Sequence, residues 1–202
     1  MYLPRTLQGY LASASRQFPV LLLTGARQVG KTSLLRHASE AGRGYVTLDD
    51  PLVLSLAKGD PALFLQRFPP PVLVDEIQYA PELLPYVKMA ADTLGRPGLF
   101  WLTGSQQFHL MKGVSESLAG RVAVLRLLGL SRRELLGRGS TSRPFVPEAG
   151  EPGGCPLGLQ ELYRLIWRGS LPAVAIDPAM DRDLFYGSYL QTSPFKVITP
   201  LE

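Results

Sequence analysis

The stretch Gly25-Ala26-Arg27-Gln28-Val29-Gly30-Lys31-Thr32 decides the fold of this chain, because it matches the phosphate-loop pattern G-x-x-x-x-G-K-[ST]. Residues 18–24 before it are mostly apolar and predict a buried strand. Residues 33–38 after it contain no glycine or proline and predict a helix. A glycine-rich loop between a strand and a helix is the arrangement that surrounds a chain of phosphates.

The residue types in this loop follow from the charge of a phosphate chain. Backbone N–H groups and the positive end of a helix dipole surround the anion, while Gly25 and Gly30 let the backbone approach where a Cβ would collide. Lys31 is expected to reach the β- and γ-phosphates and to act in catalysis, and Thr32 to offer its hydroxyl to Mg²⁺. A chance match in an ordinary loop is the alternative, and the flanking strand and helix argue against it. The nucleotide-binding residues predicted here are Gly25, Ala26, Arg27, Gln28, Val29, Gly30, Lys31, Thr32 and Ser33.

A second element carries two acids. The apolar residues 72–74 lead directly into Asp75 and Glu76, about 45 residues after the loop. A buried parallel strand delivers its polar residues at its carboxyl end, where ligands bind in open α/β sheets. We expect Asp75 to hold the Mg²⁺ shell and Glu76 to polarise the attacking water as general base. Taken alone, such a run marks a strand meeting solvent.

Three further strands are expected over residues 44–48, 99–106 and 122–128, with helices between them. This alternation predicts a parallel α/β sheet flanked by helices. Thr103, Ser105 or Gln106, at the end of one strand, could sense the γ-phosphate, although Ser105 could equally start a turn or cap a helix. Asp49 and Asp50 could touch a metal or a partner, but a capping role before Pro51 is preferred.

The composition of the chain limits the class of protein, its location and its partners. The chain has 202 residues, of which 46% are hydrophobic and 19% charged, so it can bury a core. No apolar run approaches the ~20 residues of a membrane span, and the start lacks the apolar core of a signal peptide. Cys155 is the single cysteine, so no intrachain disulfide can form and a cytoplasmic location is expected. The net charge of +4 permits a nucleic-acid partner but gives it little support.

We expect three regions along the chain. Residues 1–136 form the nucleotide-binding core, residues 137–158 a linker rich in Gly and Pro, and residues 159–202 a short helical appendage. Within the core, a helix is expected over residues 111–119. Arg121 follows it, and is either a solvated surface residue or an arginine that neutralises γ-phosphate charge on a neighbouring subunit.

Several segments, in this order, resemble the AAA-type ATPases. More closely, the chain resembles a bacterial and archaeal group of predicted ATPases with a AAA core and a poorly characterised C-terminal domain. The matching segments are Leu23 to Thr32, Leu48-Asp49-Asp50-Pro51, Val74-Asp75-Glu76-Ile77-Gln78, Leu102-Thr103-Gly104-Ser105-Gln106 and Ser117-Leu118-Ala119-Gly120-Arg121.

This resemblance implies a five-stranded P-loop sheet ordered 5-1-4-3-2 and binding of ATP with Mg²⁺. It also implies a metal acid at Asp75, a catalytic glutamate at Glu76, a sensor at Ser105 and a finger at Arg121, which would require a homo-oligomer. Members of the group usually run on beyond the segment where this likeness stops, at Thr192. We therefore expect a chain that is truncated or shifted in frame, with a C-terminal domain that is only begun.

Two functions follow as expectations. The first is an ATPase that converts ATP to ADP and phosphate. The alternative is a nucleotide-binding switch with little hydrolysis, feeding a DNA-binding or protein-interaction domain. A P-loop kinase is a third reading, and a water-activating Glu76 argues against it because kinases exclude water from the reacting phosphate.

Overall fold

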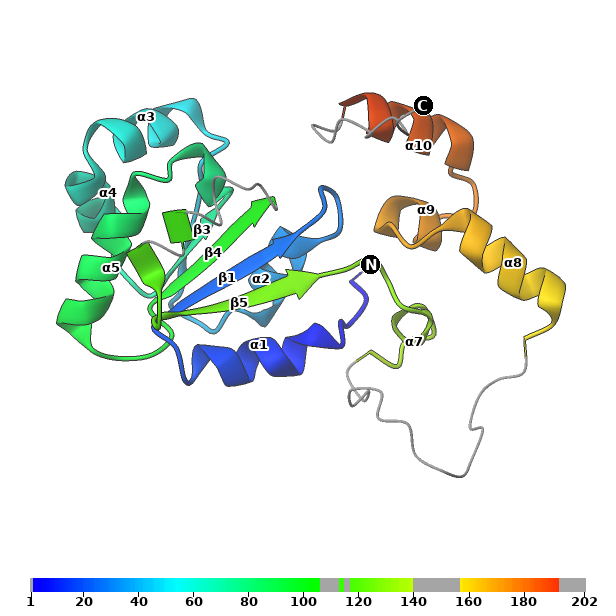
Figure 1. The fold of residues 1–202 in the computed structure, drawn as a ribbon, viewed down its shortest axis with the longest axis horizontal. Helices are drawn as coiled ribbons and strands as arrows, with labels where there is room; N and C mark the ends of the chain where they lie inside the picture. Colours follow the sequence, from blue (N-terminus) through cyan, green and yellow to red (C-terminus); the bar gives the residue numbers. More distant parts are fainter. Residues whose placement is uncertain (1, 106–112, 115–116, 140–156, 193–202) are drawn as a thin grey trace, which may run out of the picture.

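A parallel sheet of five strands forms the centre of the computed structural model, which describes residues 2–105, 113–114, 117–139 and 157–192 (Figure 1). The strands are β1 (Val20–Gly25), β2 (Gly44–Thr47), β3 (Val72–Asp75), β4 (Phe100–Ser105) and β5 (Val122–Leu127). They are ordered β2-β3-β4-β1-β5, and every neighbouring pair is parallel. This is the predicted 5-1-4-3-2 order, seen from the other edge of the sheet.

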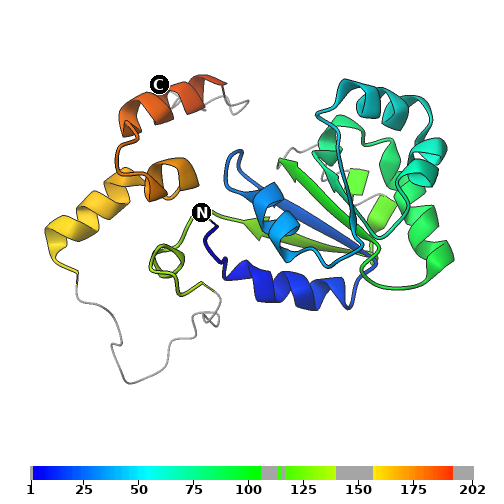
Figure 2. The same ribbon diagram turned by 180° about the vertical axis from the view of Figure 1, so that it is seen from behind.

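The apolar run of β1 explains why helices cover both faces of the sheet. All six of its residues are buried. Val20 and Leu22 pack into one core with the helices α3, α4 and α5, whereas Leu21 and Leu23 pack into a second core with α1 and α2. The two layers are visible in Figures 1 and 2. A strand at the centre of such a sandwich has no solvent-facing side, so it is apolar throughout. The helices are α1 (Leu7–Ser15), α2 (Lys31–Ala38), α3 (Pro51–Gly59), α4 (Pro61–Arg67) and α5 (Leu83–Leu94).

The helices α3 and α4 begin at aspartate caps. The Asp50 carboxylate accepts hydrogen bonds from the N–H groups of Leu52 and Val53 at the start of α3. Asp60 accepts from the N–H of Leu63 at the start of α4. Such caps satisfy N–H groups that have no partner within the helix. The preferred capping role of Asp50 is confirmed.

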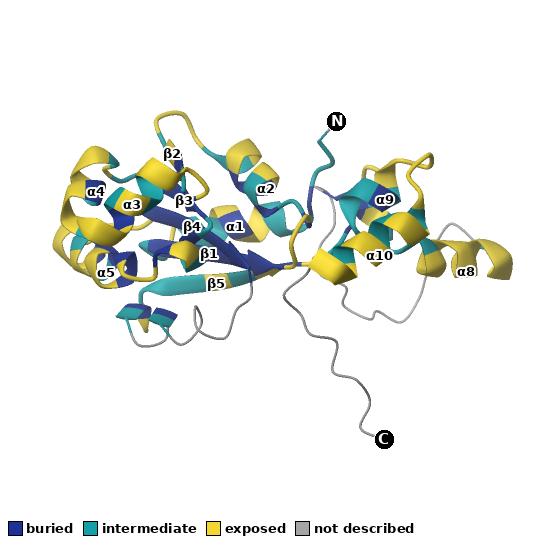
Figure 3. Ribbon diagram, turned by 90° about the horizontal axis from the view of Figure 1, so that it is seen from above, coloured by how far each residue is buried: buried dark blue, intermediate teal, exposed yellow. Residues whose placement is uncertain are grey.

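The C-terminal helices α8 (Leu159–Arg168), α9 (Pro172–Ile176) and α10 (Arg182–Thr192) lie beyond the edge at which β1 ends (Figures 1 and 3). The Tyr189 hydroxyl donates to the carbonyl of Arg27 in the phosphate loop at 3.2 Å. The apolar side chains of α8, such as Leu159 and Ile166, are mostly exposed. The five-residue α9 was not expected. Within the described part of the chain, none of the helices has the length and apolar character that crossing a membrane requires.

Some expected features fall outside the described residues. These are residues 111, 112, 115 and 116 of the helix predicted over 111–119, most of the linker predicted over 137–158 and the tail after Thr192. The described residues 113–114 and 117–118 of that helix are helical.

Candidate functional site

The phosphate loop lies at the carboxyl edge of the sheet, between β1 and α2. Gly25 has φ 152°, and a Cβ built there would lie 2.4 Å from the carbonyl oxygen of Leu127 at the end of β5. Gly30 has φ 94°. Both conformations are strained for residues with a Cβ. Gly25 is therefore needed because a neighbouring strand is close, a reason that the sequence pattern does not reveal.

The side chain of Lys31, the first residue of α2, reaches back into the phosphate loop. This side chain is buried, and Nζ donates to the carbonyls of Gly25 and Ala26 at 3.3 and 3.0 Å. Burial lowers the pKa of Lys31, while the carboxylates of Glu76 and Asp75 act in the opposite direction. The acids thus lie close enough to the ammonium group to influence it. Because its partners here are neutral carbonyls, the ammonium can exchange them for phosphate oxygens at little electrostatic cost.

Asp75 is the point at which three elements meet. Its carboxylate accepts hydrogen bonds from Thr32 Oγ1 at 3.0 and 2.9 Å, from the Tyr45 hydroxyl at 3.2 Å and from Thr103 Oγ1. The contact between Thr32 and Asp75 joins the two residues predicted to hold Mg²⁺. A hydroxyl and a carboxylate are the hard oxygen donors that Mg²⁺ prefers, and this metal keeps several waters, so two protein ligands suffice. The residues fit the ion.

The backbone leaves the extended conformation of β3 at Glu76. This residue has φ 60°, and its N–H donates to Thr103 Oγ1 at 3.0 Å. The short helix η1 (Ile77–Tyr79) follows, and Gln78 Nε2 donates to Glu76 Oε2. A non-glycine residue in the left-handed region is uncommon and is often found at functional sites. The turn gives the two adjacent acids different partners, as separate roles for them would require.

Ser105, the predicted sensor, ends β4. Its N–H donates to Gln78 Oε1 at 3.3 Å. Its hydroxyl is buried and has no hydrogen-bond partner among the described residues. A buried polar group without a partner costs free energy and therefore calls for an explanation. Gln106, named beside it as a candidate sensor, lies outside the described residues.

Arg121 is not brought together with the other predicted residues. It precedes Val122, which pairs with Val20 at the opposite end of β1 from the loop. Its Nε forms an ion pair of 2.5 Å with Asp92, and its NH1 donates to the carbonyl of Ala119 at 3.1 Å. Because Arg121 lies at the amino edge of the sheet, it cannot serve the phosphate loop of its own chain.

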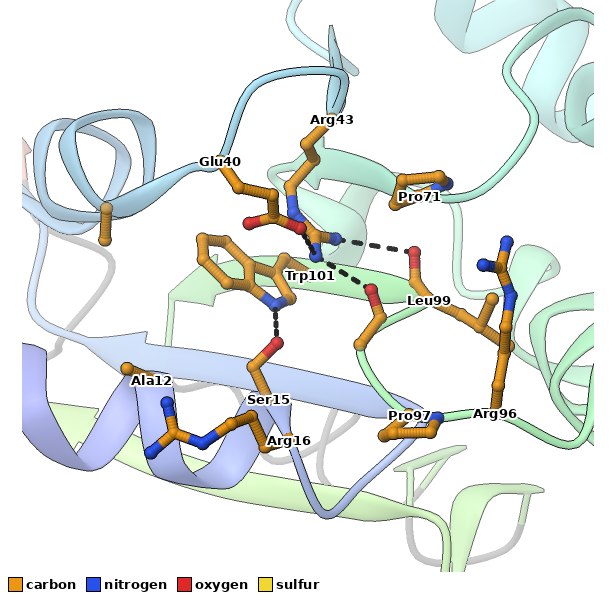
Figure 4. A pocket seen from close by; sticks show the side chains of 12 residues that line it. Ala12, Ser15, Arg16, Glu40, Arg43, Pro71, Arg96, Pro97, Leu99 and Trp101 are labelled. Carbon is orange, nitrogen blue, oxygen red and sulfur yellow. Dashed lines mark hydrogen bonds and ion pairs between the residues drawn. The ribbon is translucent and has the colours of Figure 1, made fainter.

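A pocket of about 580 Å³ also lies at the amino edge, away from the phosphate loop (Figure 4). The Arg43 guanidinium stacks on the Trp101 ring at 4.1 Å and donates to the carbonyls of Gly98 and Leu99 at 2.8 and 3.5 Å. It also pairs with Glu40. These contacts join the segment before β2 to the segment before β4, so Arg43 acts as a structural brace there.

A buried ion pair that no local residue pattern indicates lies behind the loop. Arg5 NH1 donates to the carbonyl of Val29 at 3.0 Å, and Arg5 Nε lies 3.1 Å from Glu134 Oε1. Both side chains are buried. Glu134 also accepts from the Ser131 N–H, in a capping box at the start of α7 (Arg132–Leu135). The pair therefore connects the N-terminal segment and α7 to the phosphate loop.

The sheet order, the loop after β1, the acid at the end of β3 and the polar end of β4 together define a AAA-type P-loop ATPase. A family model described as "AAA domain" matches residues 17–136, and the chain belongs to this family.

Two curated relatives match part of the chain. They are Uncharacterized protein Mb2031c of Mycobacterium bovis and Uncharacterized protein Rv2008c of Mycobacterium tuberculosis. Each is 35% identical over 125 residues, which is 62% of this chain and 28% of the relative. The match thus spans less than a third of the length of these relatives.

The fold is shared with the solved structure of another protein. AMPPCP-bound DnaA from Aquifex aeolicus has a TM-score of 0.50 and 14% identity, covering 95% of this chain and 60% of that one. The Walker-type ATPase of Pyrococcus abyssi has a TM-score of 0.43 and 19% identity, covering 65% and 57%.

Proposed function

We propose that the chain binds ATP together with Mg²⁺ and hydrolyses it to ADP and phosphate. The observation that carries this proposal is the contact of Thr32 Oγ1 with both oxygens of Asp75, at 3.0 and 2.9 Å, beside the buried ammonium of Lys31. Lys31 supplies a cation for the phosphates, and Thr32 and Asp75 supply a pair of oxygen ligands for the metal. AMPPCP in the DnaA structure agrees with a nucleotide ligand.

In this proposal each residue has a separate role. The loop N–H groups and Lys31 bind the phosphate chain, and Thr32 with Asp75 would hold Mg²⁺. The metal, when bound, neutralises charge on the phosphate oxygens. Glu76 accepts a proton from the attacking water, and Ser105 offers its buried hydroxyl to the γ-phosphate.

The test is Mg²⁺-dependent phosphate release from ATP. Glu76→Gln should bind an ATP analogue as the wild type does and lose about 100-fold or more of its turnover, because the amide is a poor base. Glu82→Gln, an exposed glutamate at the start of α5, is the matched control and should retain turnover. Equal turnover of Glu76→Gln and wild type would remove Glu76 from the mechanism.

A second candidate function is a nucleotide-binding switch with little hydrolysis. The position of Arg121 favours it, because this arginine is held by Asp92 at the edge away from the loop. A single copy of the chain would then bind ATP without the positive charge that speeds transfer. A single-turnover assay separates the two functions, since ADP formation above the uncatalysed rate at low protein concentration counts against the switch.

A further inference from the structure

The side-chain amide of Gln78 is bound at both of its ends within the site. Its Nε2 donates to Glu76 Oε2, and its Oε1 accepts from the Ser105 N–H at 3.3 Å. Because one neighbour is a carboxylate and the other an N–H, these contacts fix which end of the amide is oxygen and which is nitrogen. A single side chain therefore joins the acid after β3 to the end of β4.

We propose that Gln78 is a positioning residue that holds the carboxylate of Glu76 and couples it to Ser105. The inference rests on the proposed hydrolysis of ATP. It adds a residue of the same site that sets the position of the Glu76 carboxylate. A γ-phosphate that engages the Ser105 hydroxyl moves or stiffens the end of β4. Gln78 carries this change to Glu76 Oε2 and leaves Oε1 to receive the water.

A second contact between Glu76 and β4 supports a role for this link in positioning. Glu76 is tied to β4 a second time, because its N–H donates to Thr103 Oγ1 at 3.0 Å. The backbone of Glu76 is thus held directly by Thr103 of β4, and its carboxylate is held by Gln78 of η1, which in turn contacts Ser105 of β4. Held in this way, the carboxylate loses little entropy when it meets the water.

The amide of Gln78 contributes little to the core. Its neighbours Ile77 and Ala80 are buried in the hydrophobic core, whereas Gln78 is half-buried and outside that cluster. Removing its amide should therefore spare the fold. An amide is also required, because a carboxylate at this position has no proton to donate and would repel Glu76.

The experiment compares Gln78→Ala and the nearly isosteric Gln78→Glu with the wild type. Both variants should bind an ATP analogue within about threefold of the wild-type Kd. Both should lose between about tenfold and 100-fold in kcat with KM little changed, because only the placement of the base is disturbed. Gln66→Ala, an exposed glutamine on α4, is the matched control.

A double-mutant cycle separates positioning from a general structural effect. If Gln78 acts through Glu76, adding Gln78→Ala to Glu76→Gln should cost no further turnover. The inference would be overturned if the double variant lost turnover by the product of the two single losses, or if the Gln78 variants were as active as the wild type. Either result would leave the proposed hydrolysis standing.

Amide hydrogen exchange at Ser105 gives a readout that needs no hydrolysis. Exchange of this N–H should be faster in Gln78→Ala than in the wild type, because its acceptor is gone. Unchanged exchange would overturn the link. A wild-type chain that binds ATP but releases no phosphate would overturn the proposed function, and the positioning role with it, whatever the exchange shows.

Discussion

Lys31 is the residue on which nucleotide affinity should depend most. Its buried ammonium contacts neutral carbonyls of the loop and lies near two carboxylates. We expect Lys31→Ala to weaken binding of an ATP analogue by about 100-fold or more, because the variant leaves several phosphate charges without a cation. Calorimetry measures the loss. Lys58→Ala, which removes an exposed lysine on α3, should bind as the wild type does, and a wild-type Kd for Lys31→Ala would contradict the assignment.

Tyr45 is a residue of the site that the sequence analysis did not select. Its hydroxyl donates to Asp75 Oδ2 at 3.2 Å, and its ring lies under Arg36. Tyr45→Phe keeps the ring and removes the donor, so the Asp75 carboxylate loses one of the contacts that orient it. We expect the Mg²⁺ concentration for half-maximal turnover to rise by about tenfold, as for other residues that orient a metal ligand.

Turnover measured against Mg²⁺ concentration tests this expectation. Tyr10→Phe, at an exposed position on α1, serves as control. Identical Mg²⁺ curves for Tyr45→Phe and the wild type would show that the hydroxyl has no bearing on the metal.

At the scale of elements, the end of β1 tolerates no side chain at Gly25. An added Cβ would lie 2.4 Å from the Leu127 carbonyl, and that oxygen belongs to the backbone of β5. Gly25→Ala should therefore destabilise the fold by at least about 2 kcal/mol. Gly59→Ala is the control, because nothing lies within 4 Å of its added Cβ. Chemical denaturation compares the two, and equal stabilities would contradict the close approach of β1 and β5.

The contact between α7 and the N-terminal segment depends on pH. Burial alone would raise the pKa of Glu134, but the N–H groups of Ser131 and Thr6 and the Arg5 guanidinium outweigh it and hold the pKa below its ordinary value. The charged carboxylate therefore stabilises the fold above the unfolded-state pKa, and this contribution is lost as the pH falls through the lower, folded-state pKa.

Unfolding free energies at pH 7 and near pH 3 test this linkage. Glu134→Gln should lose about 3 kcal/mol at pH 7, because Arg5 stays buried without its partner, and the gap to the wild type should narrow in acid. Glu161→Gln, at an exposed position of α8, should show neither effect. If the difference in unfolding free energy between Glu134→Gln and the wild type were the same at both pH values, the ionised pair would not be its cause.

The sequence predicts those parts of the site that are local along the chain. The loop glycines, the acid after an apolar strand and the cap at Asp50 each depend on residues within a few positions of one another. Tyr45 and Thr103 could not be selected in this way. They reach Asp75 because β2 and β4 flank β3, and the register across strands is set by packing.

At the scale of the whole molecule, the nucleotide site and Arg121 lie at opposite edges of one sheet. Each copy would thus carry a loop at one edge and an arginine at the other, the arrangement that suits head-to-tail assembly. Asp92 pairs with Arg121 in the single chain, and both side chains are partly exposed. A salt bridge of this kind is weak, so a neighbouring phosphate can displace it.

We therefore expect turnover per chain to rise with protein concentration if Arg121 completes the site of a neighbour. Arg121→Ala should lose this rise, whereas Arg96→Ala, an exposed arginine between α5 and β4, should keep it. Mixing provides the sharper measurement. Lys31→Ala retains the arginine and Arg121→Ala retains the loop, so a mixture of the two should show more turnover than the sum of the separate variants. A rate strictly proportional to concentration, with no recovery on mixing, would place Arg121 among the surface residues and leave hydrolysis to the single chain.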